Sequence, residues 1–104
     1  MKKILLVCSA GMSTSLMVAK MKEAAEASGE TIRIMASAEA DLEENLEGVN
    51  LVLLGPQVRY LEAKLRSRVP AEVPVRVIDS VDYGTMNGAK VLAGAMAEIK
   101  GREG

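Results

Sequence analysis

Short apolar runs alternate along the chain with longer amphipathic stretches, and the runs predict β-strands. Residues 3–8 and 50–54 are almost continuously apolar, a pattern typical of parallel strands that are buried on both faces. Residues 75–78 form a shorter run that predicts a further strand. Residues 31–36 alternate apolar and polar positions instead, which indicates a strand nearer an edge of the sheet. We therefore expect four strands.

The stretches between these runs carry apolar residues at helical spacing. Residues 14–28 repeat them every three or four positions, and Gly29 is a suitable stop because glycine tolerates the left-handed conformation that often follows a helix. Residues 57–68 and a last stretch that ends near Lys100 have the same period, so we expect helices there. The acidic segment 39–46 is short and only weakly helical.

Two segments lack a clear period. We expect residues 79–84 to form a loop and residues 101–104 to be frayed at the end of the last helix.

Strands that alternate with helices across short connections predict an α/β fold. We expect one domain over residues 1–104, with a four-stranded parallel sheet in the order 2-1-3-4 flanked by helices. In such sheets the functional site lies outside the carboxyl ends of the strands. Cys8, the pair Gly55-Pro56 and residues 79–83 all fall at that end, so we expect the site among them.

Composition excludes several classes of function. The formal net charge is −1, from 13 basic and 14 acidic residues, which argues against binding to the phosphate backbone of nucleic acids. The chain has no histidine, which rules out a Ser-His-Asp or Cys-His hydrolase within it and removes the commonest zinc ligand. No metal or other cofactor is expected.

The single cysteine excludes an intramolecular disulfide. No apolar run approaches the roughly 20 residues of a membrane-spanning helix. We therefore expect a cytoplasmic protein, where a free thiol stays reduced.

The join between the first strand and the first helix carries the candidate chemistry. Small residues around a glycine let successive backbone N–H groups point inward and bind an anion, and the following helix adds its own N–H groups and its dipole. The same field stabilises a thiolate at Cys8, which makes the sulfur both a nucleophile and a leaving group for a phosphoryl group. The alternative is that Cys8 is only a small buried hydrophobe at a strand end. The candidate loop consists of Cys8, Ser9, Ala10, Gly11, Met12, Ser13, Thr14 and Ser15.

Three blocks of the sequence closely resemble the IIB (EIIB) components of the bacterial phosphoenolpyruvate-dependent sugar phosphotransferase system, in the lactose/cellobiose branch. The blocks are residues 3–16, residues 53–60 and the segment from 78–79 to 83–88. With the matching length, the resemblance covers essentially the whole chain. It implies a fold similar to that of low-molecular-weight tyrosine phosphatases.

The resemblance implies a phosphotransferase that acts as a phosphocarrier. Cys8 matches the family's phosphorylated cysteine, and residues 9–15 match its phosphate loop. A IIA (EIIA) partner phosphorylated on histidine would donate to Cys8, and phosphocysteine would donate to a sugar held by the membrane-embedded IIC (EIIC) partner. The sugars implied are β-linked disaccharides such as cellobiose, chitobiose or lactose.

Met12, Leu16 and Tyr83 are candidates for a partner surface. An apolar residue in an anion-binding loop gains little locally, so Met12 and Leu16 are interpreted as facing a partner, with simple packing as the alternative. Two interpretations stay open for Gln57, Arg59 and Tyr83. They line the site or that surface, or they are, respectively, a residue in the first turn of a helix, an exposed charge and a core ring. We expect a monomer that meets its partners transiently.

Two other functions compete with the phosphocarrier. Low-molecular-weight tyrosine phosphatases and the arsenate reductases like them carry the pattern Cys-x5-Arg, and here Thr14 stands in the arginine position. Without a guanidinium to clamp phosphate, hydrolysis of phosphocysteine should be slow. Asp79 or Asp82 would have to serve as the acid. A regulatory module is the second alternative, but the chain has no DNA-binding segment.

Overall fold

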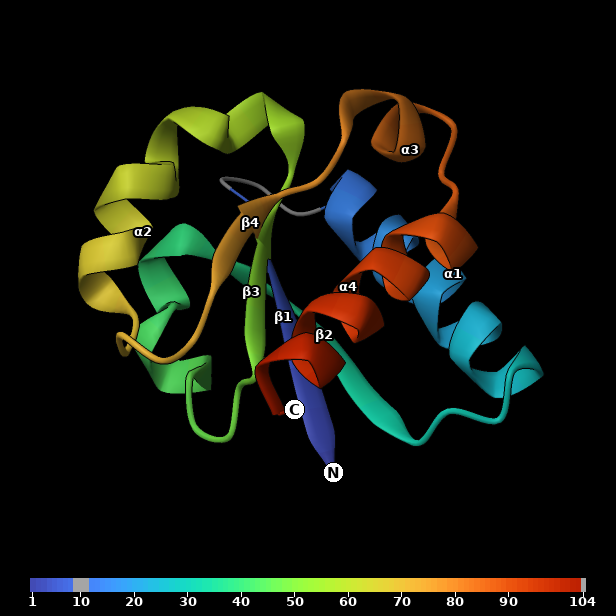
Figure 1. Ribbon diagram of the computed structural model, residues 1–104. Helices are drawn as coiled ribbons and strands as arrows, with labels where there is room; N and C mark the ends of the chain where they lie inside the picture. The colour runs from blue at the N-terminus through green and yellow to red at the C-terminus, as the bar shows by residue number, and fades with distance from the viewer. Residues whose placement is uncertain (9–11, 104) are drawn as a thin grey trace.

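A single parallel sheet of four strands organises the chain (Figure 1). The computed structural model describes residues 1–8 and 12–103, and the side chains of residues 12, 13 and 103 also lie outside the description. The strands run in the order β2-β1-β3-β4, and each neighbouring pair is parallel. The predicted fold class and strand order are therefore confirmed.

Each strand is followed by one or two helical segments. The strands are β1 (Lys2–Cys8), β2 (Ile32–Ala38), β3 (Leu51–Leu54) and β4 (Val75–Val77). The α-helices are α1 (Met12–Ala27), α2 (Glu62–Arg68), α3 (Ser80–Gly84) and α4 (Gly88–Glu103), and short 3₁₀ helices lie at η1 (Glu39–Asp41), η2 (Glu43–Asn45) and η3 (Pro56–Leu61).

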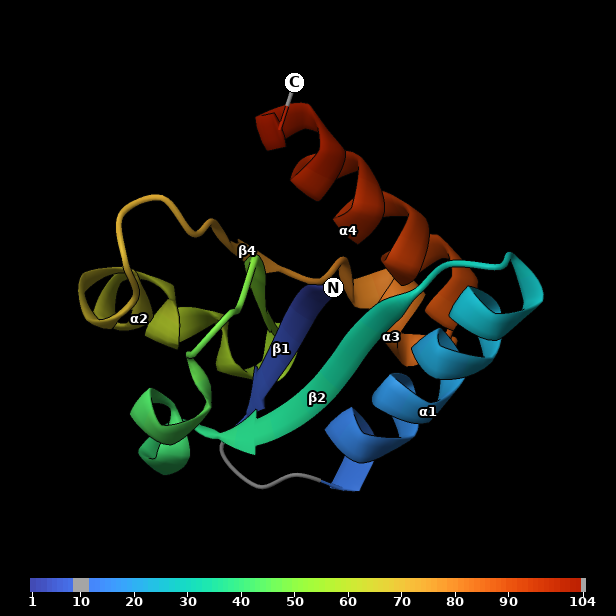
Figure 2. The same cartoon turned by 90° about the horizontal axis from the view of Figure 1, so that it is seen from below.

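Helices cover both faces of the sheet, which explains why the central strands are apolar throughout. Figure 2 shows α1 and α4 on one face, with α2 and the first 3₁₀ helices on the other. Successive side chains of a strand point to opposite faces. Ile4 and Leu6 pack with α1 and α4, whereas Leu5 and Val7 pack in the second core cluster under α2. All four are fully buried.

Segment 79–84 was predicted to be a loop, and that prediction is wrong. Residues 80–84 form the short helix α3, and the Asp79 side chain caps it by accepting hydrogen bonds from the backbone N–H groups of Val81 and Asp82 at 3.0 and 3.1 Å. Aspartate is a favourable N-cap because its oxygen satisfies N–H groups that have no partner within the helix. The cap turns the segment back toward the start of α1.

Two helix boundaries also differ from the prediction. The expected helix over 57–68 is divided into η3 and α2, with a non-helical backbone at Val58 (φ −119°, ψ 24°). The last helix continues through residues 101–103 instead of fraying there, while residue 104 lies outside the described residues.

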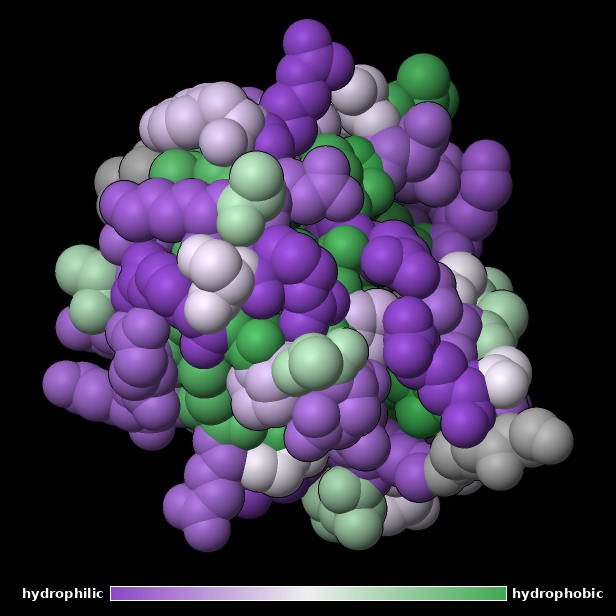
Figure 3. Space-filling view, turned by 60° about the vertical axis from the view of Figure 1, so that its left-hand side comes forward, coloured by the Kyte–Doolittle hydropathy of each residue, from purple (hydrophilic) through white to green (hydrophobic). Residues whose placement is uncertain are grey.

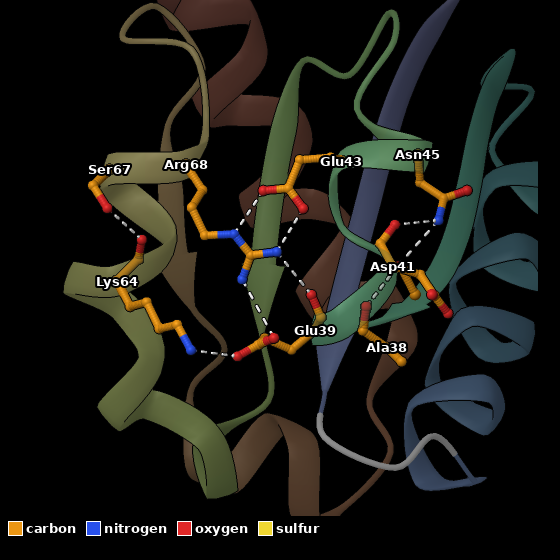
Figure 4. A network of polar contacts seen from close by, with 9 residues as sticks. Ala38, Glu39, Asp41, Glu43, Asn45, Lys64, Ser67 and Arg68 are labelled. Atoms are coloured by element: carbon orange, nitrogen blue, oxygen red, sulfur yellow. Dashed lines mark hydrogen bonds and ion pairs between the residues drawn. The ribbon is translucent and has the colours of Figure 1, made fainter.

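Charged side chains tie α2 to the segment after β2 (Figure 4). Arg68 donates two hydrogen bonds to the Glu43 carboxylate at 2.6 and 2.7 Å and lies 3.3 Å from the Glu39 carboxylate, to which Lys64 also donates at 2.9 Å. The hydrogen bond from Arg68 lowers the pKa of Glu43 to about 2. Hydrogen bonds from Lys64 and Arg68 lower the pKa of Glu39 as well. On this side of the molecule, polar side chains cover most of the surface in view, and apolar atoms show in small patches between them (Figure 3).

Candidate functional site

Cys8 is the last residue of β1, the strand that pairs with both β2 and β3. It is a free cysteine, and only 1% of its surface is exposed. Residues 9–11 join it to α1, which begins at Met12. The sequence prediction that Cys8 stands at the carboxyl end of a buried strand, just before a helix, is confirmed. The chemistry assigned to it stays a prediction.

The beginning of α1 has the electrostatics that an anion requires. The helix has 16 residues, and its first turn contains no acidic side chain. The first N–H groups of a helix lack partners within it, and its dipole leaves partial positive charge there. A negative charge near the start of α1 would therefore be stabilised.

The structure describes only part of the predicted phosphate loop. Ser9, Ala10 and Gly11 lie outside the described residues, as do the side chains of Met12 and Ser13. Thr14 is buried, with 1% exposure, and Ser15 is exposed.

A polar cluster of two buried residues and one exposed residue joins three segments at this end of the sheet. The Thr14 hydroxyl and the Tyr83 hydroxyl are hydrogen-bonded at 3.2 Å, and the Gln57 side-chain amide donates to the Tyr83 hydroxyl oxygen at 3.2 Å. Thr14 comes from α1, Gln57 from η3 and Tyr83 from α3. Sequence reasoning named all three residues as candidates for the site but missed this bonding between them, since the contacts depend on where α3 turns back.

Tyr83 does not fit the predicted partner surface. Only 8% of it is exposed, and it packs in the core cluster between the sheet, α1 and α4. The alternative interpretation, a core ring, describes it better. It is nevertheless a polar core ring, because its hydroxyl reaches Thr14.

Leu16 is 49% exposed, which is compatible with the predicted partner surface. Sequence reasoning missed Val81 of α3, an apolar residue that is 69% exposed. The hydrogen bond between Thr14 and Tyr83 holds α3 beside the first turn of α1, as Figure 1 also shows. The only available signal for Val81 was its place in a segment at the carboxyl end of the sheet.

The acids that a phosphatase would need are engaged elsewhere. Asp79 caps α3 through its Oδ2. The Asp82 carboxylate lies 3.2 Å from the ammonium group of Lys90. Both carboxylates therefore already have partners within the fold.

Two features are absent from the described residues. Within residues 1–8 and 12–103, no group of three or more His, Cys, Asp or Glu residues is arranged to hold a metal ion. No helix in those ranges combines the length and the apolar character needed to cross a membrane.

Three known proteins that are similar to this chain are all EIIB components of phosphotransferase systems. The chain is 42% identical over 98 residues to the oligo-beta-mannoside-specific EIIB component of the phosphotransferase system of Bacillus subtilis (strain 168), covering 93% of this chain and 95% of that protein. It is 44% identical over 100 residues to the cellobiose-specific EIIB component of Lactococcus lactis subsp. lactis (strain IL1403), covering 90% and 93%. The galactose-specific EIIB component of Lactococcus lactis subsp. cremoris (strain MG1363) matches equally well, at 44% over 100 residues with the same coverage.

A solved structure of a IIB component is also similar to this chain. The solution structure of the cellobiose-specific phosphotransferase IIB component protein from Borrelia burgdorferi superposes with a TM-score of 0.80 at 39% identity, covering 97% of this chain and 94% of that one. Residues 3–94 match the family described as "PTS system, Lactose/Cellobiose specific IIB subunit". The chain therefore belongs to the lactose/cellobiose-specific IIB family of the sugar phosphotransferase system.

Proposed function

We propose that this chain is a phosphocarrier in which Cys8 receives a phosphoryl group from a IIA protein and gives it to a sugar bound by a IIC protein. The observation that carries the proposal is the position of Cys8, the chain's one cysteine, at the end of β1 and just ahead of α1. The first N–H groups of α1 lack partners within the helix, so the negative charge of a phosphoryl group near them would be stabilised. Because the chain belongs to a IIB family, we interpret a cysteine at that position as the residue that carries the phosphoryl group.

In the first step the Cys8 sulfur attacks the phosphorus of phosphohistidine. A sulfur–phosphorus bond forms, the nitrogen–phosphorus bond breaks, and the proton that the thiol loses goes to the released imidazole nitrogen. Because this chain has no histidine, the phosphohistidine belongs to the partner. The N-terminus of α1 stabilises the charge of the phosphoryl group once it is on the sulfur.

In the second step a sugar hydroxyl attacks the phosphorus of phosphocysteine. An oxygen–phosphorus bond forms, the sulfur–phosphorus bond breaks, and the sulfur leaves as a thiolate while the hydroxyl proton passes to solvent or to the acceptor protein. The same sulfur is the nucleophile of the first step and the leaving group of the second. One arrangement therefore serves both transfers.

A carrier must also keep its phosphoryl group from water. The position that holds arginine in the Cys-x5-Arg phosphatases is Thr14 here, and its hydroxyl is bonded to Tyr83. A guanidinium would clamp the phosphoryl oxygens and stabilise the transition state of hydrolysis. Its replacement by threonine, together with the engaged carboxylates of Asp79 and Asp82, favours retention over hydrolysis.

The family resemblance implies a sugar of the β-linked disaccharide class, and the choice of sugar is a property of the IIC partner. The relatives named for oligo-beta-mannoside, galactose and cellobiose are 42% to 44% identical to this chain. Identity at this level therefore does not select one of these sugars. As a carrier between a IIA donor and a membrane-embedded IIC acceptor, the protein acts in the cytoplasm as a monomer.

The test is a reconstituted relay. The chain is incubated with phosphoenolpyruvate, the general phosphotransferase proteins and candidate IIA proteins, and the modified residue is mapped by mass spectrometry. One phosphoryl group per chain, on Cys8, is the expected result. Label on any other residue would refute the assignment. Turnover of an aryl phosphate without a IIA protein would instead support the phosphatase.

A further inference from the structure

The polar cluster of Thr14, Gln57 and Tyr83 connects the candidate phosphate site to the rest of the fold. Thr14 and Tyr83 are 69 positions apart in sequence, and Gln57 and Tyr83 are 26 apart. Thr14 lies in the first turn of α1, the turn whose N–H groups the proposed function uses. Tyr83 is therefore the residue through which α3 and the segment after β3 both reach that turn.

Burial gives the hydrogen bond between Thr14 and Tyr83 more weight than a similar bond on the surface. Thr14 is 1% exposed and Tyr83 is 8% exposed. A buried hydroxyl that loses its partner bears the cost of desolvation without compensation, so the paired arrangement is strongly preferred. The first turn of α1 is thereby held in one position relative to β3 and α3.

The direction of the hydrogen bonds suits a site for an anion. The Gln57 side-chain nitrogen can only donate, so the Tyr83 oxygen accepts from it. The Tyr83 hydroxyl can then donate to the Thr14 oxygen, which leaves the Thr14 hydrogen to be given to a further acceptor. An O–H group that accepts a hydrogen bond becomes a better donor. In that arrangement the donors point in sequence from Gln57 through Tyr83 toward the start of α1.

We infer that Tyr83 is a positioning residue for phosphoryl transfer at Cys8. Through Thr14, its hydroxyl fixes the first turn of α1, while Gln57 fixes the hydroxyl. The inference rests on the proposed function, since it concerns the rate of that transfer. It assigns no contact between Tyr83 and the phosphoryl group.

The chain supplies a matched control, because its only other tyrosine is Tyr60, which is 73% exposed. Tyr83→Phe and Tyr60→Phe each remove one hydroxyl and nothing else. The rate of phosphoryl acceptance is measured against the concentration of phosphorylated IIA. We expect Tyr83→Phe to lower the maximal transfer rate about tenfold, or about 1.4 kcal/mol in activation free energy, with the half-saturating concentration unchanged. Tyr60→Phe should leave the maximal rate unchanged.

A double-mutant cycle separates positioning from a general loss of stability. Thr14→Val removes the other hydroxyl of the same bond, and it also tests the inference if Tyr83→Phe does not fold. If Tyr83 acts through Thr14, the double variant should transfer no more slowly than Thr14→Val alone. Multiplied rate losses in the double variant would contradict the inference.

The failure of the inference can be told from the failure of the proposed function. If the unaltered protein accepts a phosphoryl group and Tyr83→Phe transfers as fast as Tyr60→Phe, the positioning role is wrong and the carrier function stands. If the unaltered protein accepts none from any phosphorylated IIA protein, the carrier function is overturned, and the positioning role is overturned with it.

Discussion

Gly88 and Lys20 meet backbone to backbone, at the point where α4 begins against α1. A Cβ atom at Gly88 would lie 2.5 Å from the carbonyl carbon of Lys20 and 2.7 Å from its carbonyl oxygen. Separations this short are not compatible with van der Waals contact, and a helix backbone cannot move aside as a flexible side chain can. Glycine at position 88 therefore sets how closely the two helices pack on their face of the sheet.

Gly88→Ala should destabilise the protein by about 1–3 kcal/mol, the usual cost of overpacking. The control is Gly94→Ala in the same helix, where an added Cβ would meet nothing within 4 Å. That change should be neutral or stabilising by up to about 1 kcal/mol, because alanine is the better helix former. Chemical denaturation of both variants measures the difference. Equal stabilities would show that the helices can move apart at little cost.

The pairing of Arg68 with Glu43 and Glu39 should make stability depend on pH in the acid range. Since the pKa of Glu43 is lowered from 4.5 to about 2, its stabilising effect is complete above pH 4.5 and is lost as the pH falls toward 2. The lowered pKa of Glu39 acts in the same direction.

Arg68→Met should therefore reduce the free energy of unfolding most above pH 4.5, and the difference from the unaltered protein should shrink toward pH 2. Arg33→Met, at an exposed position of β2, serves as the charge-matched control, for which no such trend is expected. Denaturation curves at several pH values test this. A difference for Arg68→Met that stays constant down to pH 2 would mean that the ion pairs contribute nothing.

Patterns along the chain were enough to predict the sheet, because its central strands are buried on both faces. The run from Ile4 to Val7 divides between two core clusters by simple alternation, and any exposed face would have interrupted it. Helix α3 was missed for the opposite reason. A helix of five residues has too few positions to show a period, and its existence depends on one side chain, the Asp79 cap.

The candidate site could likewise be predicted from the sequence only in part. Cys8 could be found from sequence because strand, small residues and helix follow one another directly. The cluster around Tyr83 could not, since residues separated by 26 and 69 positions meet only after α3 has turned back over α1. Val81 was overlooked because an exposed apolar residue in a supposed loop carries no periodic signal.

Cys8→Ser should abolish acceptance of the phosphoryl group while the fold persists. A serine hydroxyl is scarcely ionised near neutral pH, so it is a poor nucleophile at a site that has no histidine to act as a base. Acceptance is followed with labelled phosphoenolpyruvate and the complete relay, and circular dichroism reports the fold. Relay of phosphate to sugar by the serine variant would show that the mechanism is wrong.

Leu16 and Val81 should form part of the surface that meets phosphorylated IIA. Both are exposed apolar residues, and they flank the bonded pair Thr14 and Tyr83 on α1 and α3. Leu16→Asp would place a charge in a contact that excludes water, next to a partner that carries a negative phosphoryl group. We expect the half-saturating concentration of phosphorylated IIA to rise about tenfold, or about 1.4 kcal/mol, with a smaller rise for Val81→Asp.

Ala63→Asp is the control for these two changes, because it adds the same charge at an exposed position of α2, across the sheet from α1. It should leave the half-saturating concentration where it is. Equal effects of all three substitutions would point to the net charge of the protein instead of a local contact, since long-range repulsion acts on any added carboxylate and weakens with salt. Repeating the titrations at higher ionic strength separates the two causes, because the loss caused by Leu16→Asp should persist when that of a distant charge is screened.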